Sequence, residues 1–334
     1  MHRKIQVPKS LMRTVGGLFG LLMLITFLPS AAVAATPYPT KVIRLIAPFD
    51  AGGTSDLVAR VFAGELSKVL GKQVYVENRV GAGGTIGAAV AATATPDGYT
   101  LLLTSSAHPI SYFIYKKLPY DYKNAFLPIA KVGSGASSLV AYPGFGANSI
   151  KELIAMAKEK PGQLFYSTAG VGGFQHMGME LFKLMAGVDM VAVHFKGGGA
   201  AIIDTMGGHS QVQFASLISH LPHIRSGKLK ALGTGGAKRT MLLPDVPTIA
   251  EAGLPGYDMN NWWGVFAPAG TPAPIVEVLN KACATALNSS ETKKEFLAQG
   301  VEVDHMGPAE FGKFVDDETV KYGKIIKQAG IVAQ

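Results

Sequence analysis

The chain has 334 residues, a formal net charge of +8 and a single cysteine, Cys283. Four basic residues and no acidic ones lie in the first 34 residues, which leaves a formal charge of +4 and no Lys/Arg run that would indicate a nucleic-acid surface. One cysteine excludes an internal disulfide, and a chain of this length can bury a sufficient core without one. We expect Cys283 to be a small buried side chain in a helix.

The first 34 residues have the order of a secretory signal peptide. Residues 1–13 are basic, residues 15–28 are apolar or small apart from Thr26, and Ala32-Val33-Ala34 fits the small-x-small cleavage rule. An apolar segment of this length, at about 1.5 Å per residue, is too short to cross a hydrocarbon core of about 30 Å. We therefore predict a signal peptide over residues 1–34 and an exported protein that starts near Ala35.

Strand and helix patterns alternate from residue 41 to residue 105. Leu57, Val61, Leu66 and Leu70 fall roughly on one face of the first helical segment. The order strand, helix, strand, helix, strand predicts a parallel sheet with right-handed crossovers. The segments are the strands 41–48, 73–78 and 99–105 and the helices 56–70 and 85–94.

The pattern changes after Lys117 and then restarts. Residues 118–133 are rich in turn formers, and a helix is predicted from Ser149, which forms a capping box with Glu152. Two α/β series with a restart near 135–145 indicate two lobes. The later segments are the strands 164–170, 190–197, 211–216, 229–236 and 262–270 and the helices 174–187, 200–208, 218–227, 272–287, 291–299 and 308–329.

Glycine and hydroxyl residues gather directly after the predicted strands. In open α/β sheets ligands bind beyond the carboxyl ends of the strands, where the next helix offers free N–H groups. Small residues also let the backbone approach a ligand closely. Both halves of the chain therefore carry loops suited to an anion, at residues 52–53, 81–84, 105–106, 167–173 and 196–199.

The motifs of common enzymes and nucleotide-binding proteins are missing from these loops. The dinucleotide fingerprint fails because Ile86 and Gln175 stand where a third glycine is needed, and the sequence has neither a P-loop nor a G-x-S-x-G elbow. His220 and His223 lack a neighbouring carboxylate or cysteine that would complete a metal site. We expect no catalytic residues, no metal and no cofactor, and a binding protein whose lobes close on its ligand.

The ordered motifs resemble the Bug family, the periplasmic solute receptors of tripartite tricarboxylate transporters. The likeness runs from about Tyr38 to Ile331. It implies a type II periplasmic binding-protein fold, with two α/β lobes, a hinge and a ligand cleft, in which the C-terminal helices return to the first lobe. The motifs include YPTKVIRLIAPFDAGGTSDLVAR (38–60), VENRVGAGGTIGA (76–88), ATPDGYTLLLTSS (94–106) and LLPDVPTIAEAGLPGY (242–257).

The resemblance also implies a function and a domain division. It implies a monomer that binds a small carboxylated metabolite through backbone N–H groups, hydroxyls and water, and delivers it to membrane permease subunits. Residues 35–138 and 256–334 would form lobe 1, and residues 139–255 would form lobe 2. The positions carried over as ligand-binding are Phe49, Asp50, Gly53, Thr54, Asn78, Gly83, Ser105, Ser106, Thr168, Ala169, Gly170, Phe195 and Lys196.

Several positions depart from the family pattern. Asp50 and Ala51 stand where members often have prolines, Gln213 and Ser216 where they often have aspartate, and Phe174 and Gln175 where many members carry Ser or Thr after the Ala-Gly pair. Asp50 would repel a dianion by about 1 kcal/mol at 4 Å even in water. It can point to solvent, pair with a cationic group of the ligand, or accept a ligand hydroxyl, and the last two would favour an amino acid or a hydroxy acid.

Aromatic residues near the loops leave the ligand class open. Core packing is the ordinary role of such side chains. If two or more of them line the cleft, an aromatic acid resembling benzoate or nicotinate becomes a candidate ligand. A ligand sensor and an enzyme on the same scaffold remain alternative functions, although no acid/base pair or nucleophile is evident. The aromatic candidates are Phe49, Phe174, Phe195, Trp262 and Trp263.

Overall fold

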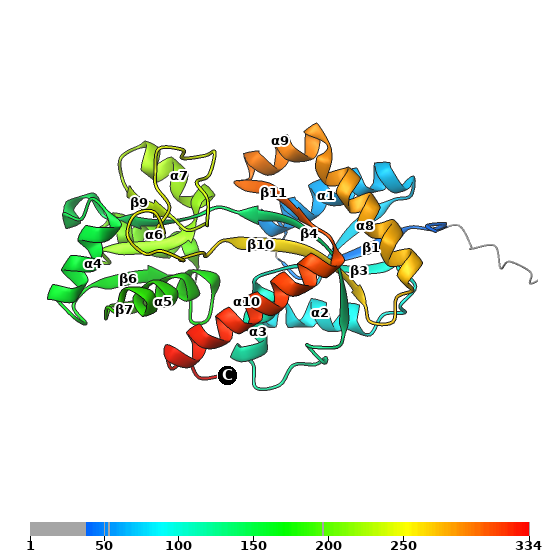
Figure 1. The fold of residues 1–334 in the computed structure, drawn as a ribbon, viewed down its shortest axis with the longest axis horizontal. Coiled ribbons are helices and arrows are strands. Elements are labelled where there is room, and N and C mark those ends of the chain that lie inside the picture. The colour runs from blue at the N-terminus through cyan, green and yellow to red at the C-terminus, as the bar shows by residue number, and fades with distance from the viewer. Residues whose placement is uncertain (1–37, 50, 53, 196, 334) are drawn as a thin grey trace, which may run out of the picture. The chain divides into compact units, whose positions relative to one another are not determined.

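The computed structural model describes residues 38–49, 51–52, 54–195 and 197–333. The predicted signal peptide and three of the candidate ligand residues, Asp50, Gly53 and Lys196, lie outside them. Within the described residues the chain forms two β-sheets, each covered by helices, and these are the two lobes of the α/β fold (Figure 1).

The six-stranded sheet of the first lobe has the order β11-β4-β10-β3-β1-β2. β1 pairs in parallel with β2 and β3, as the strand–helix alternation predicts, whereas β10 and β11 enter antiparallel. The carboxyl ends of β1, β2 and β3 therefore meet at one edge of the sheet. The strands are β1 (Ile43–Ala47), β2 (Val74–Asn78), β3 (Thr100–Ser105), β4 (Phe126–Gly135), β10 (Asn261–Pro268) and β11 (Val301–Met306).

The five-stranded sheet of the second lobe has the order β7-β6-β8-β5-β9. β6 pairs in parallel with β7 and β8, and β5 runs antiparallel to β8 and β9. The loops after β6, β7 and β8 consequently lie at a common sheet edge. The strands are β5 (Ser137–Ala141), β6 (Phe165–Thr168), β7 (Val191–His194), β8 (Val212–Ser216) and β9 (Lys230–Thr234).

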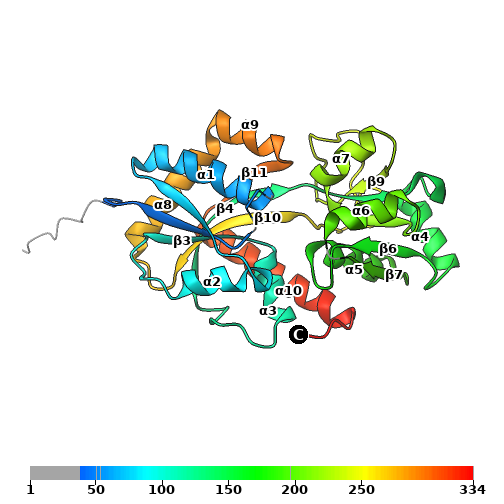
Figure 2. The same cartoon turned by 180° about the vertical axis from the view of Figure 1, so that it is seen from behind.

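Helices cover both faces of the six-stranded sheet. α1 (Thr54–Leu70), α8 (Ala273–Asn288) and α9 (Ser290–Ala298) pack on one face, and α2 (Thr85–Ala92) and α10 (Pro308–Gln328) pack on the other. Figure 2 shows α1 and α2 on opposite sides of β1 and β3. Successive strand residues point to opposite faces of the sheet. Leu45 therefore packs in the core beneath α1, α8 and α9, and Ile46 in the core beneath α2 and α10.

The predicted buried face of α1 is wrong in part. Of the predicted residues only Leu66 is buried, while Leu57 and Leu70 are partly exposed. Val58 and Phe62, which were not predicted, are buried beside Leu66. Positions 58, 62 and 66 are four residues apart and therefore share one face, which rotates the buried stripe by one position. The N-cap half of the predicted capping box of α4 (Ile150–Glu159) is confirmed, because the Glu152 N–H donates to Ser149 Oγ over 3.2 Å. The Glu152 carboxylate accepts from the Asn148 N–H over 2.7 Å, one residue before the predicted Ser149.

The second lobe packs α4 and α5 (Phe174–Ala186) against its sheet, and α6 (Gly198–Met206) and α7 (Leu217–Arg225) lie on the other face. Its larger core also takes in Ile114 of α3 (Ala107–Ile114) and Ile325 of α10. The last helix thus packs against the sheet of the first lobe and reaches α5 of the second (Figure 1).

The chain changes sheet at Ala136, between β4 and β5, and again between β9 and β10. Two sequence interpretations are corrected here: the turn-rich segment 118–133 contains most of the long strand β4, and β11 follows α9 where no strand was predicted. Both strands gain hydrogen bonds only from partners distant in sequence. The residue boundaries of the lobes stay predictions.

Candidate functional site

Two adjoining cavities lie beyond the carboxyl ends of β1 and β3. Their volumes are about 630 Å³ and 240 Å³, and both are bordered by Gly83, Ala107 and Asn261. Ser216 of the second lobe lines the larger cavity, and Phe174 lines the smaller one. Residues of both lobes therefore enclose one continuous region, which we call the cleft.

The loop between β1 and α1 is held in place by Asp56. This carboxylate is buried and accepts hydrogen bonds from the Gly52 N–H (2.9 Å), Arg60 Nε (2.9 Å) and Asn78 Nδ2 (2.8 Å). Burial acts to raise the pKa of Asp56, but the hydrogen bonds from Arg60, Gly52 and Asn78 outweigh it and lower the pKa. The carboxylate stays charged and anchors the loop.

Asn78 completes this anchor. Its Nδ2 also donates to the Phe49 carbonyl oxygen over 3.1 Å, and its Oδ1 accepts from Arg60 Nη2 over 2.9 Å. Both ends of the amide are thus engaged with the loop and with α1. The structure places Asn78 behind the loop, where it positions Phe49.

A glycine-rich turn after β2 forms another wall of the cleft. Gly83 has φ 62°, a left-handed value that favours glycine, and it lies in the short 3₁₀ segment Ala82–Gly84 that leads into α2. A Cβ at Gly83 would stand 3.1 Å from the hydroxyl of Tyr115. Glycine at this position therefore lets the backbone that borders both cavities lie close to Tyr115.

Two hydrogen bonds inside the cleft wall use serine oxygens as acceptors. Trp263 Nε1 donates to Ser55 Oγ over 2.8 Å, and the Ala107 N–H donates to Ser105 Oγ over 3.3 Å. Each serine oxygen that accepts such a bond can still donate its own hydroxyl proton. The described lining residues of the cleft carry no charged side chain. The cleft is therefore a neutral surface with hydroxyl donors, aromatic rings and small residues.

The loop after β6 is fastened by the first residues of α5. The Ala169 N–H donates to Gln175 Oε1 over 2.8 Å, and the Gly172 N–H donates to His176 Nδ1 over 3.0 Å. The N–H of Ala169, one of the predicted carboxylate donors, is thus occupied by a side chain of the protein itself. A carboxylate that takes this N–H must displace Gln175.

His176 is neutral in this arrangement. Its Nδ1 must be unprotonated to accept the Gly172 N–H, and its Nε2 lies 3.8 Å from Glu180 Oε1. Burial lowers the pKa of His176 to about 4, against the opposing effect of Glu180. Lys183 neutralises Glu180 at 2.8 Å. The shape of the 170–173 loop thus depends on an uncharged imidazole.

The structure brings together some of the predicted ligand residues and not others. Thr168 is fully buried at the end of β6, and its carbonyl oxygen accepts the Phe195 N–H over 2.8 Å. Asn78, Thr168, Ala169, Gly170 and Phe195 do not line the two cavities, and Asp50, Gly53 and Lys196 lie outside the described residues. The predicted residues that line the cleft are Phe49, Thr54, Gly83, Ser105 and Ser106.

Several residues that line the cleft were not among the predicted ligand residues. Ser55 follows Thr54 at the start of α1, so proximity alone could have suggested it. Asn261 and Trp263 lie two positions apart in β10 and therefore point to the same side of the sheet. Alternation within the segment NNWW would have placed them together, but not in the cleft.

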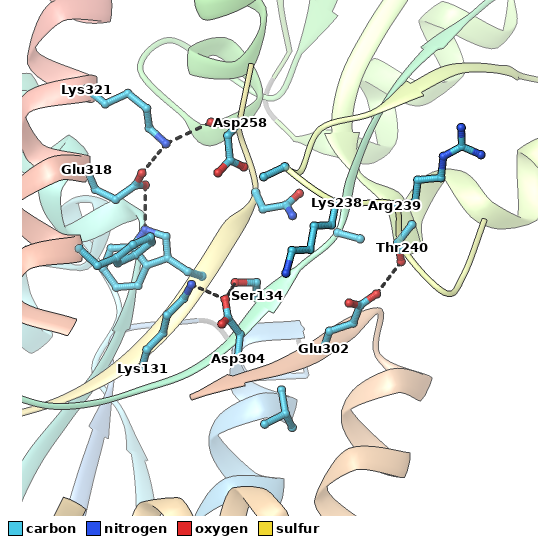
Figure 3. A pocket seen from close by; sticks show the side chains of 16 residues that line it. Lys131, Ser134, Lys238, Arg239, Thr240, Asp258, Glu302, Asp304, Glu318 and Lys321 are labelled. Carbon is cyan, nitrogen blue, oxygen red and sulfur yellow. Dashed lines mark hydrogen bonds and ion pairs between the residues drawn. The ribbon is translucent and has the colours of Figure 1, made fainter. Parts of the chain in front are cut away.

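A third cavity, of about 360 Å³, lies between the lobes and is bordered by charged side chains (Figure 3). We call it the rear cavity. Asp304 of β11 accepts from the buried Lys131 Nζ over 2.5 Å and from Ser134 Oγ over 2.8 Å. Glu318 of α10 accepts from Trp262 Nε1 over 3.0 Å and pairs with Lys321.

His220 and Cys283, which the sequence analysis also considered, are buried side chains inside the fold. His220 is buried, with Ser138 Oγ at 2.8 Å from Nδ1 and Gln213 Oε1 at 3.0 Å from Nε2. Cys283 is buried in α8, and burial raises the pKa of its thiol to about 12. The described residues contain no cluster of three metal-ligating side chains, nor a helix long and apolar enough to cross a membrane.

Residues 58–331 match the tripartite tricarboxylate transporter family receptor, TctC. The chain belongs to this family. It is 36% identical to protein BugT of Bordetella pertussis over 303 residues, which cover 90% of this chain and 93% of BugT. The resemblance to the Bug family is confirmed, and the type II periplasmic binding-protein fold with it.

Solved relatives share the whole fold. Rpa4515 of R. palustris, solved with adipate, superposes with a TM-score of 0.75 at 32% identity and covers 89% of this chain and 100% of its own. MatC of Rhodopseudomonas palustris, solved with bound malate, gives 0.71 at 31% identity and covers 86% and 100%. The family and the fold are those of solute-binding receptors, and receptors of this family are periplasmic.

Proposed function

We propose that this protein is a periplasmic receptor that binds a small carboxylate in the cleft and delivers it to a tripartite tricarboxylate-type permease. The observation that carries the proposal is the cleft itself, which is walled by both lobes and rich in neutral donors. Carboxylate oxygens are acceptors only, so a wall that offers neutral hydroxyl and amide donors suits them.

Neutral donors fit the task of a receptor that must also release its ligand. A buried ion pair carries a large desolvation cost and is hard to separate once formed. Hydroxyl and N–H donors contribute about 1 kcal/mol each, and several together give useful affinity while the ligand can still leave. The adipate and malate bound by relatives are carboxylates of suitable size.

We further propose that each lobe supplies half of the site. Phe49, Thr54, Gly83, Ser105 and Ser106 would form the half on lobe 1 (35–138 and 256–334). Thr168, Ala169, Gly170 and Phe195 of lobe 2 (139–255) would approach when the lobes close around the crossings near Ala136 and Asn261. Asp50, Gly53 and Lys196 complete the proposed set, and Asn78 supports it from behind the loop by positioning Phe49.

An aromatic carboxylate is a specific candidate for the ligand. Phe49 and Trp263 line the larger cavity and Phe174 lines the smaller one. Aromatic rings pack well against one another in offset and edge-to-face geometries. Trp262, by contrast, lines the rear cavity, and Phe195 lines none of the three cavities.

The direct test is mass spectrometry of the ligand released from gently purified protein, followed by calorimetry with adipate, malate, benzoate and nicotinate. We expect micromolar binding of at least one of them. Tight binding of a sugar or a metal ion, with no binding of any carboxylate, would overturn the proposal. Loss of carboxylate uptake on deletion of the gene tests the delivery step, and sequencing of the mature N-terminus tests cleavage near Ala35.

Asp50 has its own test. If it contacts a donor group of the ligand, Asp50→Asn will lower the affinity for malate, which carries a hydroxyl, more than that for adipate, which has none. A variant with wild-type affinity for both would assign Asp50 to solvent.

A further inference from the structure

Asn261 lies where the chain enters the first lobe from the second, and it lines both cavities of the cleft. It is the first residue of β10, the strand by which the chain re-enters the six-stranded sheet from the second lobe, and it pairs with Gly135 at the end of β4. It also borders both cavities. A ligand that fills the cleft therefore has to pass beside this side chain.

The amide of Asn261 has a defined orientation. Ser106 Oγ lies 2.5 Å from Oδ1 and donates to it, and Ser106 is itself 1% exposed and therefore fixed. An asparagine amide offers one acceptor oxygen and two N–H donors. With the oxygen directed at Ser106, the two N–H donors remain for a group in the cleft.

We propose that Asn261 determines the specificity of the cleft for anions, with its Nδ2 donating to a carboxylate oxygen of the ligand and Ser106 setting the amide orientation. The described lining residues of the cleft are all uncharged, so a neutral donor among them has to contact the carboxylate. This inference rests on the proposed carboxylate-binding function and names the residue that discriminates charge.

The decisive variant is Asn261→Asp. The carboxylate keeps an oxygen for Ser106 and is nearly isosteric with the amide, but it replaces both N–H donors with a negative charge that repels an anionic ligand. We expect the affinity for adipate or malate, measured by calorimetry, to fall at least about tenfold, because one donor is lost and one repulsion is gained.

The uncharged diamide of adipate, adipamide, separates charge recognition from general damage to the site. Asn261→Asp should weaken adipate binding and leave adipamide binding within about threefold of wild type, because an amide ligand can offer its own N–H donors to the new carboxylate. An equal loss for both probes, or no loss for either, would overturn the assignment.

A matched control carries the same change elsewhere. Asn288 is exposed at the end of α8, outside the residues that line the cleft, and Asn288→Asp adds the same charge there. It should bind both probes as wild type does. Ser106→Ala should lower adipate affinity by a smaller factor than Asn261→Asp, since it frees the amide without charging it.

Folding and the parent proposal can be judged separately. Circular dichroism and thermal melting report whether Asn261→Asp folds. If it does not, the neutral Asn261→Ala replaces it, and we expect its affinity for adipate to be several-fold lower than that of the wild type. Wild-type affinity of Asn261→Ala for adipate would contradict the proposal. If wild-type protein binds no carboxylate, the proposed function fails. If wild type binds and the Asn261 variants bind equally well, only the role of Asn261 fails.

Discussion

Two alternating pairs of residues at the start of β10 line different cavities. Asn261 and Trp263 line the neutral cleft, whereas Asn260 and Trp262 line the charged rear cavity. Each tryptophan donates its indole N–H to a fixed partner, Ser55 in the cleft and Glu318 in the rear. The two-residue period of a strand thus separates a donor-rich surface from an ion-paired one.

The rear cavity and the cleft differ in the charge of the side chains that line them. In the rear cavity Lys131 pairs with Asp304 and Lys321 with Glu318, so these four charges are paired within the protein. In the cleft the described lining residues are neutral, and Asn261 and the serine hydroxyls offer hydrogen-bond donors. The first arrangement supports the fold, and we propose that the second one selects the ligand.

The largest effect should come from breaking an ion pair of the rear cavity. The Lys131 side chain is 4% exposed and that of Asp304 is 42% exposed. Asp304→Asn would leave the buried ammonium without its counter-charge, and we expect a loss of about 3 kcal/mol of unfolding free energy. Chemical denaturation measures it, and ligand affinity should not change. A fall in affinity of the same size would show that the two cavities are not independent.

The pH dependence of the same pair has a defined sign. Burial acts to raise the pKa of Asp304, but the hydrogen bond and charge of Lys131 and the Ser134 hydroxyl lower it. A lowered carboxyl pKa stabilises the fold above the unfolded value of about 3.9, and this contribution is lost as the pH falls further. The wild-type protein should show this loss below about pH 4, and Asp304→Asn should not.

His176 should make the free energy of unfolding depend on pH at a higher pH than Asp304 does. Its pKa is lowered from 6.5 to about 4 in the fold, so the unfolded chain binds the extra proton first. Stability therefore falls as the pH drops from about 6.5 to about 4, by up to about 2–3 kcal/mol. Denaturation curves across this range test it. His176→Gln cannot titrate and should show a shallower fall, whereas an identical slope would contradict the assignment.

The two tryptophans form a pair of variants with smaller effects. Trp262→Phe and Trp263→Phe each remove one indole N–H, which donates to Glu318 or to Ser55, at a cost of about 1–2 kcal/mol. Glu318 keeps its ion pair with Lys321. We expect only Trp263→Phe to change the affinity for adipate, because only its partner lies in the cleft wall. Calorimetry on both variants decides this. A change in affinity for Trp262→Phe alone would reverse the assignment of the two cavities.

Gln175 should have the smallest effect. Gln175→Ala frees the Ala169 N–H that its side chain occupies. If a ligand carboxylate takes this N–H, removing the competitor should raise adipate affinity by about two- to tenfold. The exposed Gln163→Ala is the control and should behave as wild type. A lower affinity for Gln175→Ala would show that Gln175 shapes the loop for binding.

Local patterns were sufficient for much of the fold. The alternation from β1 to β3 predicts a parallel sheet, and the capping box of Ser149 predicts the start of α4; the structure has both. β4 was not predicted because Pro128 and two glycines interrupt it, and β11 was not predicted between the helical patterns on either side of it. Each strand is stabilised by pairing with segments far away in the sequence.

The sequence by itself determined the family, the two α/β series and the glycine and hydroxyl loops that border the cleft, because these depend on local spacing and ordered motifs. The tertiary structure decided the roles of individual polar groups. Only folding brings Ser106 beside Asn261, Ser55 beside Trp263 and Gln175 beside Ala169. A hydrogen-bond donor is free or occupied according to its neighbours in space, and those neighbours are set by chain crossings that no local pattern encodes.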